Sequence, residues 1–316
     1  MNGREKPPDA IARPRFDPAA NARLMRLAAL ASVAVAATLI VAKIVAWLMT
    51  DSVAVLSSLL DSLLDAAASL INLFAIRHAL TPADDEHRFG HGKAEPLAGL
   101  AQSAFICGSA LILLMEAIHR LGAPQTVQRP EIGIAVSVLA IVLSMLLVMF
   151  QHRVVAQTKS VAIAADSLHY GSDALLNGAV IVAIVLSQWL QVPLIDPLFG
   201  ALISIWILWG ASKIIRQSLN VLMDRELPEA ERGRIVAIAT AHPEVRDVHD
   251  LRTRSTGTRI FIQMHLELDG TMPLAHAHAI ADKVEADILA AFPHAEVMIH
   301  EDLAGVMEPH RLATRA

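Results

Sequence analysis

The chain has 316 residues, of which 54% are hydrophobic and 18% are charged, and its formal net charge at pH 7 is −5. This apolar composition is typical of a membrane protein. The negative charge, without a basic face carrying aromatic residues, argues against nucleic-acid binding. The single cysteine, Cys107, excludes a disulfide framework, and its apolar neighbours indicate a small packed side chain.

Six apolar segments follow a polar start. Residues 1–22 are rich in proline, arginine and alanine and lack the apolar core of a cleavable signal peptide, so we expect a mobile cytoplasmic tail. Each later segment is long enough to cross a bilayer, which takes about 20 residues. The expected spans are 24–49, 54–79, 95–120, 131–152, 160–190 and 197–219. Short loops join them, so consecutive helices should be antiparallel neighbours within a membrane domain of residues 23–222.

Basic residues flank these spans unevenly. Only Arg120 and Arg129 fall on one side of the membrane. The other side receives Arg13, Arg15, Arg23, Arg26, Arg77, Arg88, Lys93, Arg153, Lys159, Lys213, Arg216 and Arg225. The positive-inside rule therefore predicts that both termini are cytoplasmic. Lys43 lies deep in the first span, where it could either snorkel or pair with an acid.

Residues 223–303 have the composition of a soluble domain. The pattern predicts a helix at 228–241, strands at 245–254 and 258–269, a helix at 273–292 and a strand at 296–300, before a loose tail at 304–316. The second strand alternates, with Ile260, Ile262, Met264, Leu266 and Leu268 on one face. The order α-β-β-α-β predicts a small α+β domain, ferredoxin-like or metallochaperone-like, attached to a polytopic α-helical membrane protein with six transmembrane helices.

Two polar turns interrupt the apolar spans. Asp61 and Asp65 are four residues apart in the second span, as are His169 and Asp173 in the fifth. Positions i and i+4 share one helix face, so each turn can direct two metal-ligand side chains the same way. An ionisable residue at the centre of a membrane helix costs about 2.5–3.5 kcal/mol, so three acids together cost on the order of 8–10 kcal/mol. Lys43 alone cannot neutralise them, and a cation, protons or water must offset the rest.

These four side chains suit a divalent metal. Aspartate oxygen and histidine nitrogen are typical ligands of tetrahedral Zn²⁺, and four of them leave no open position for catalysis. Protons compete with the metal for the same atoms, because the ligands must be deprotonated to bind it. The pattern therefore predicts a metal/proton antiporter. Asp166 lies one turn before His169; we expect a solvated residue near the cytoplasmic end of the span, with a hydrogen-bond acceptor or proton relay as the alternatives.

Further histidines and acids lie outside the spans. Asp84, His87 and His91 share a loop at spacings that could surround one ion, although a solvated polar loop explains them equally well. The soluble domain is rich in histidine, and His249 and His265 fall on adjacent predicted strands. Residues this distant in sequence can converge at one edge of a small sheet.

Four segments carry a family resemblance. They are residues 60–65, the loop 83–95 with the sequence ADDEHRFGHGKAE, residues 168–173 and residues 248–252. Together they resemble the cation diffusion facilitator family of divalent-metal transporters, and its bacterial zinc and ferrous-iron efflux members in particular, over residues 24 to 302. The resemblance implies a homodimer in the bacterial inner membrane, with a cytoplasmic metal-binding domain on each subunit, which exports Zn²⁺ against proton entry by alternating access.

The resemblance also implies roles for individual residues. It places Asp61, Asp65, His169 and Asp173 on the transport site, where one histidine with three aspartates is the pattern associated with zinc and cadmium, and aspartate at position 169 would widen acceptance toward iron or manganese. It places a second metal on Asp84, His87 and His91. It implies a two-metal cytoplasmic site formed by His249, His265, His278, His300 and a bridging Asp302. It pairs Lys93 with Asp224 in a charge interlock.

The remaining predictions are negative or leave alternatives open. His242, His276, His294 and His310 match no such position, so we expect solvated surface residues. The cytoplasmic metals are expected to act in sensing, with a structural role as the alternative. No HExxH or GxSxG motif is present, which argues against an enzyme. A sensor or channel without proton-coupled transport remains the competing reading, and Cd²⁺, Fe²⁺, Co²⁺ and Mn²⁺ remain open as cargo.

Overall fold

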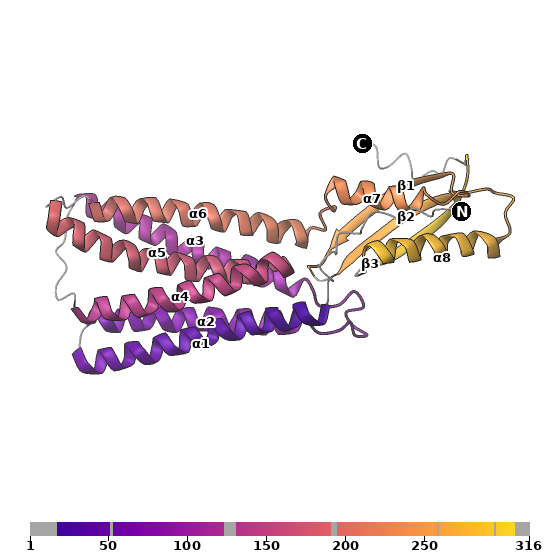
Figure 1. The fold of residues 1–316 in the computed structure, drawn as a ribbon. Helices are drawn as coiled ribbons and strands as arrows, with labels where there is room; N and C mark the ends of the chain where they lie inside the picture. Colours follow the sequence, from indigo (N-terminus) through magenta and orange to yellow (C-terminus); the bar gives the residue numbers. More distant parts are fainter. Residues whose placement is uncertain are drawn as a thin grey trace, which may run out of the picture.

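A computed structural model describes six long helices followed by a small mixed domain. The described residues are 18–50, 53–122, 131–190, 195–257, 259–293 and 295–306. The helices of the bundle are α1 (Pro18–Thr50), α2 (Val53–Ala79), α3 (Ala94–Gly122), α4 (Glu131–Thr158), α5 (Val161–Leu190) and α6 (Ile195–Leu222). The C-terminal domain contains α7 (Glu229–Ala239), β1 (Asp247–Ser255), β2 (Ile260–Leu268), α8 (Leu274–Ala291) and β3 (Ala295–Leu303). The bundle and the C-terminal domain lie end to end (Figure 1).

The expected polytopic helical fold with an α+β domain is confirmed. Among the described residues, α1, α2, α3, α4 and α6 each contain a stretch long and apolar enough to cross a membrane. The remaining helix, α5, has 30 residues and is therefore about 45 Å long. It carries ionisable side chains in its first half and packs against α3, α4 and α6. Its polar turn thus lies inside the bundle.

The first helix begins earlier than expected. We predicted a tail through residue 22, but α1 starts at Pro18. Proline is well tolerated in the first turn of a helix, because the backbone N–H that it lacks has no partner there. Residues 1–17 and 307–316, which hold the rest of the two expected tails, lie outside the described residues.

Small side chains let the helices of the bundle approach closely. One core cluster joins α1, α2, α4 and α5, and its members are Met25, Ala28, Ala29, Leu73, Ile76, Val154, Ala162 and Ile163. Many large apolar side chains instead face outward, including Leu48, Ile71, Ile112 and Leu202. Small residues at helix interfaces and apolar residues on the outer surface are the arrangement that a lipid environment favours.

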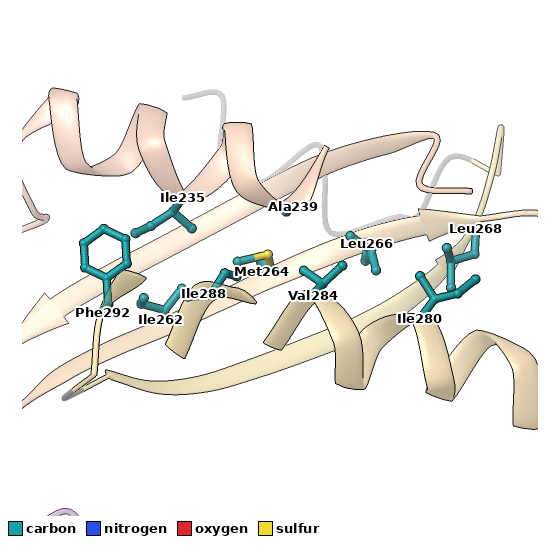
Figure 2. Close-up of a cluster of buried hydrophobic side chains, with 10 residues drawn as sticks. All are labelled: Ile235, Ala239, Ile262, Met264, Leu266, Leu268, Ile280, Val284, Ile288 and Phe292. Atoms are coloured by element: carbon teal, nitrogen blue, oxygen red, sulfur yellow. The ribbon is translucent and has the colours of Figure 1, made fainter. Parts of the chain in front are cut away.

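The C-terminal domain is a three-stranded sheet with both helices on one face. The strand order is β1-β2-β3, with β1 antiparallel to β2 and β2 parallel to β3 across the α8 crossover. The apolar face of β2 packs against α7 and α8 (Figure 2). This core consists of Ile235, Ala239, Ile262, Met264, Leu266, Leu268, Ile280, Val284, Ile288 and Phe292. The strand histidines His249, His265 and His300 lie on the opposite face of the sheet.

Strand β3 is longer than the sequence suggested. We predicted an end at His300, but the parallel ladder with β2 continues to Leu303 and pairs Asp302 with Glu267. Strand β1 has a bulge between His249 and Arg252, where Asp250 adopts a φ of 46°. A bulge re-aims the side chains around it, and this one lies beside the paired histidines.

Candidate metal sites

Three ionisable side chains meet between α2 and α5, and we call them the membrane cluster: Asp65, His169 and Asp173. The Nε2 atom of His169 lies 3.1 Å from Oδ1 of Asp65 and 3.6 Å from Oδ2 of Asp173. All three offer ligand atoms within 4.8 Å of one another. His169 is buried, with 8% of its surface exposed. Because α5 places His169 and Asp173 on one face, the sequence spacing accounts for half of this geometry.

The fourth expected ligand, Asp61, lies apart. It is exposed, and among the described residues it does not belong to the three-residue group. It occupies the same face of α2 one turn before Asp65, so it is the nearest candidate to complete a tetrahedral shell. The structure therefore brings together three of the four residues on which the sequence prediction rests.

Lys43 binds the neighbouring helix instead of reaching toward a membrane surface. Its Nζ donates hydrogen bonds to the Ser58 carbonyl oxygen at 2.9 Å and to Ser62 Oγ at 2.6 Å. Both acceptors belong to α2, and the lysine charge acts on Asp65, Asp61 and Asp173. Within the described residues, Lys43 therefore contacts a carbonyl and a hydroxyl of α2, close to the acids, and it neither snorkels to the surface nor forms an ion pair.

The expectation that Asp166 is solvated is wrong. The residue has 0% of its surface exposed. Its Oδ2 accepts hydrogen bonds from Gln151 Nε2 at 2.6 Å and from Ser32 Oγ, while its Oδ1 accepts one from Gln102 Nε2 at 3.1 Å. Those donors come from α1, α3 and α4, and they lie 134, 64 and 15 residues from Asp166 in sequence. The carboxylate therefore ties four helices together.

Tyr170 connects this junction to the membrane cluster. Its hydroxyl donates to the Ser32 carbonyl oxygen at 3.1 Å and shares a hydrogen bond with Ser69 at 2.9 Å. Its ring lies edge-on to the imidazole of His169, with 5.4 Å between centroids. Polar contacts from α1 and α2 thus fix the residue beside the central histidine.

A second group lies in the loop between α2 and α3, and we call it the loop cluster: Asp84, His87 and His91. Asp84 Oδ1 lies 3.3 Å from His87 Nδ1, and Asp84 Oδ2 lies 3.3 Å from His91 Nε2. Hydrogen bonds from the His87 backbone and side chain, together with the two histidine charges, hold the pKa of Asp84 below its usual range. The three residues have the composition of a metal site, but they are largely exposed, and such groups are common without an ion.

The expected charge pair meets where the bundle joins the C-terminal domain. Lys93 Nζ lies 2.9 Å from Asp224 Oδ1 and 3.1 Å from its Oδ2. Arg254 of β1 approaches the same carboxylate at 3.4 Å. One acid therefore contacts cations from both parts of the molecule.

A third group lies on the open face of the sheet, and we call it the strand cluster: His249, His265, His300 and Asp302. The strand register pairs His249 with His265, and His265 with His300. Oδ2 of Asp302 lies 2.8 Å from His265 Nδ1 and 3.1 Å from His249 Nε2, and Oδ1 lies 3.2 Å from His300 Nε2. Three imidazoles around one carboxylate form a donor set that fits divalent zinc.

The charge on Asp302 is favoured by its neighbours. Burial opposes ionisation, but the hydrogen bond from His265 and the charges of His265, His300 and His249 outweigh it, so the pKa of Asp302 lies below its usual range. A carboxylate that is ionised at neutral pH can bind metal without first losing a proton.

Some predicted residues lie elsewhere. His278 is exposed on α8, 3.7 Å from Asp282 and 3.7 Å from Glu301, and within the described part of the chain it belongs to none of the possible metal groups. His276 pairs with Glu244 on the surface at 2.8 Å, and the His242 ring accepts a backbone hydrogen bond from Glu244. His294 and His310 lie outside the described residues.

Two neighbours of the strand cluster were not predicted. Glu267 lies 3.4 Å from His249, and Asp250 lies 3.8 Å from His265. The alternation of β2 already placed Glu267 on the same face as His265, so that signal was present in the sequence. The position of the Asp250 side chain depends on the bulge in β1, which no sequence pattern predicted.

Comparison with known families accounts for most of the chain. Residues 29–223 match the model of the cation efflux transmembrane domain. Residues 227–304 match the cation efflux protein, cytoplasmic domain. This chain belongs to the cation efflux family. The resemblance to cation diffusion facilitators inferred from the four motifs is therefore confirmed.

Individual relatives align over nearly their full length. The cation-efflux pump FieF of Cronobacter sakazakii is 50% identical over 285 residues, which cover 90% of this chain and 95% of that protein. FieF of Serratia proteamaculans is 48% identical over 290 residues, covering 92% and 96%. Among solved structures, the zinc form of CzrB is 34% identical and covers 27% of this chain and 98% of its own, with a TM-score of 0.26.

Proposed function

We propose that this protein exports a divalent cation, with Zn²⁺ as the principal cargo, in exchange for protons. The observation that carries the proposal is the membrane cluster, in which two carboxylates and a buried imidazole meet in the middle of the helical bundle. Charges in that position need a cation or protons to offset their cost. The curated relatives named as cation-efflux pumps support the direction of transport.

The donor set favours zinc over harder cations. Imidazole and carboxylate ligands at about 2.0–2.2 Å suit Zn²⁺, whereas Mg²⁺ and Ca²⁺ prefer shells made of oxygen. Asp61 supplies the fourth ligand after a small movement of α2. The cargo is bound by atoms that also bind protons, so loading metal from one side displaces protons taken up on the other.

The strand cluster acts as a metal sensor in this proposal. Metal held by Asp302 and its three histidines stabilises one arrangement of the C-terminal domains and shifts that population. The match to a cation efflux cytoplasmic domain supports a cytoplasmic location for the C-terminal domain and, with the charge bias of the loops, for both termini. We place the protein in the bacterial inner membrane as a homodimer.

Flux through reconstituted protein tests the proposal. In sealed liposomes, zinc uptake should follow an imposed pH gradient and should be lost in Asp173→Ala. Asp287→Asn removes an exposed carboxylate of α8 that belongs to none of the possible metal groups among the described residues, so it serves as the matched control and should transport normally. Zinc current driven by voltage without a pH requirement would indicate a channel, and zinc binding without flux would indicate a sensor.

A further inference from the structure

Glu95 is a buried carboxylate that the transport scheme does not use. It lies in the first turn of α3 and has 2% of its surface exposed. A buried acid needs partners, because an unpaired charge in the protein interior is costly. Its two oxygens face different parts of the molecule, and this division is the basis of the inference.

One oxygen caps the helix that carries the membrane cluster. Oε1 of Glu95 accepts a hydrogen bond from the backbone N–H of Val161 at 2.8 Å, and the Ala162 N–H lies close enough to the carboxylate to favour its charged form. Ser160 Oγ accepts from the next N–H, that of Ile163, at 3.2 Å. The first N–H groups of a helix have no partners within it. Glu95 therefore accepts the first N–H of α5, and Ser160 accepts the third.

The other oxygen faces the C-terminal domain. A methyl group added to Gly257, between β1 and β2, would lie 3.2 Å from Oε2 of Glu95. A methyl group added to Gly92 would lie 2.6 Å from the carbonyl oxygen of Thr256, the residue before Gly257. Thr256 is itself buried. The loop at Gly92 and the turn at Thr256 and Gly257 are therefore in direct contact, with no space for an added methyl group.

Aromatic and charged contacts reinforce this junction. Phe89 stacks edge-on against Phe261 of β2 with 5.7 Å between centroids, and the Arg254 guanidinium lies 4.9 Å and 4.7 Å from the two ring centroids. Lys93 binds Asp224 in the same region. Residues 89–95 are thus held by the C-terminal domain on one side and bound to α5 on the other.

We propose that Glu95 is a positioning residue that couples the C-terminal domain to α5. If the domain tilts, the turn moves segment 89–95, and Glu95 moves with it. Helix α5 follows, because separation would leave buried N–H groups without acceptors. His169 lies eight residues beyond Val161, about 12 Å along the same rigid helix. The mechanical coupling of the C-terminal domain to α5 does not depend on transport activity. Only the expected effect on zinc flux rests on the proposed function.

Two glycines give a matched pair of variants. Gly257 and Gly305 have similar positive φ values, 88° and 79°, so alanine strains the backbone comparably at both. Only at position 257 does the new methyl group press on Glu95, because nothing lies within 4 Å of a methyl group at position 305. Gly257→Ala therefore tests the contact, and Gly305→Ala controls for strain.

The readout is amide hydrogen exchange of the full-length protein, followed by zinc flux. Glu95→Gln should speed exchange of the Val161 and Ala162 amides about tenfold, because the amide group can accept fewer hydrogen bonds than the carboxylate. Gly257→Ala should raise exchange at the same amides severalfold, although it contacts no part of α5. Gly305→Ala should leave it unchanged. Exchange in α4 should not change in any variant, which separates the coupling from general destabilisation.

The coupling is refuted if Gly257→Ala leaves exchange at the start of α5 equal to that of Gly305→Ala. Should Gly257→Ala fail to fold, Gly92→Ala replaces it, with Gly233→Ala in an open position of α7 as its control. Zinc flux should fall severalfold in the variants that raise exchange. If even the unaltered protein moves no zinc, the proposed function fails, and the exchange comparison alone decides the coupling.

Discussion

The membrane cluster draws its ligands from two helices, whereas the strand cluster draws them from three neighbouring strands. In the sheet, backbone ladders place His249 beside His265 and His265 beside His300. In the bundle, α2 packs mainly against α1, and α5 mainly against α4 and α6. The distance between Asp65 and His169 therefore depends on how the pair α1 and α2 packs against the group α4, α5 and α6. The ladders of the sheet suit a fixed metal site, whereas the packing of helices in the bundle suits a metal site that opens.

Replacing a membrane-cluster ligand should have the largest effect. Asp65→Ala should weaken zinc binding at the membrane cluster by more than about 100-fold. This loss exceeds the one typical of residues that only hydrogen-bond a metal ligand. Asp61→Ala should cost less, because the three-residue group forms without it. Calorimetric titration in a background that carries both Asp302→Ala and Asp84→Ala reduces binding at the strand cluster and the loop cluster, so that the two variants can be compared at this cluster. Equal losses for the two variants would show that the preformed group does not determine affinity.

Replacing the bridging acid should separate the two clusters. Asp302→Ala removes the carboxylate that contacts three histidines, so zinc affinity of the C-terminal domain should fall about 10–100-fold. Flux driven by a pH gradient should largely persist, since the cargo path lies in the bundle. Equilibrium dialysis and liposome flux on the same preparation measure both. Abolished flux would mean that the strand cluster belongs to the transport path.

The junction at Asp166 should behave as a fixed part of the bundle. Asp166→Leu removes the carboxylate that Ser32, Gln102 and Gln151 share as an acceptor and should destabilise the protein by about 2–4 kcal/mol. Asp166→Asn keeps one acceptor oxygen and should cost less. Thermal unfolding in detergent compares them. If Asp166→Leu unfolds like the unaltered protein, the hydrogen-bond network contributes little to holding the four helices together.

Cargo choice should depend on the imidazole. Replacing His169 by aspartate exchanges a nitrogen ligand for an oxygen ligand, so iron and manganese flux should rise about tenfold relative to zinc. Competition between metals in liposomes gives the ratio directly. An unchanged ratio would remove His169 from the selectivity argument while leaving its role in binding intact.

The smallest effect should appear at acid pH in the C-terminal domain. The pKa of Asp302 is lower in the folded protein than in the unfolded chain. Its stabilising contribution is therefore present above the ordinary aspartate pKa of about 4 and is lost as pH falls through the lower folded value. In metal-free protein, Asp302→Asn should be less stable than the parent at pH 7, and the difference should disappear in strong acid. A difference that grew with acidity would reverse the sign of the assigned shift.

Local patterns predicted the elements and half of each cluster. Helical spacing aligned His169 with Asp173, and strand alternation separated the core residues of β2 from His265. Both signals come from neighbours in sequence, where the period of the backbone fixes direction. The pairing of β1 with β2 could be expected because the two strands are consecutive in the sequence and joined by a short turn.

The remainder depended on contacts between distant segments. Asp166 looked like a residue near a helix end, but its three partners lie on other helices, and no local pattern identifies them. The end of β3 was placed early because the ladder with β2, not residue preference, extends it to Leu303. Asp61 shares a face with Asp65, yet helix packing leaves it exposed. Glu95 gave no sign of capping α5, which starts 66 residues later.

Proton movement coupled to zinc is the most direct test of the division between the clusters. Zinc is added outside sealed liposomes at equal internal and external pH, and an enclosed dye reports internal pH. The account predicts that internal pH rises as zinc enters, in the unaltered protein and in Asp302→Ala, and that neither change occurs in Asp173→Ala. Zinc entry without a pH change, or coupled movement that survives in Asp173→Ala, would contradict it.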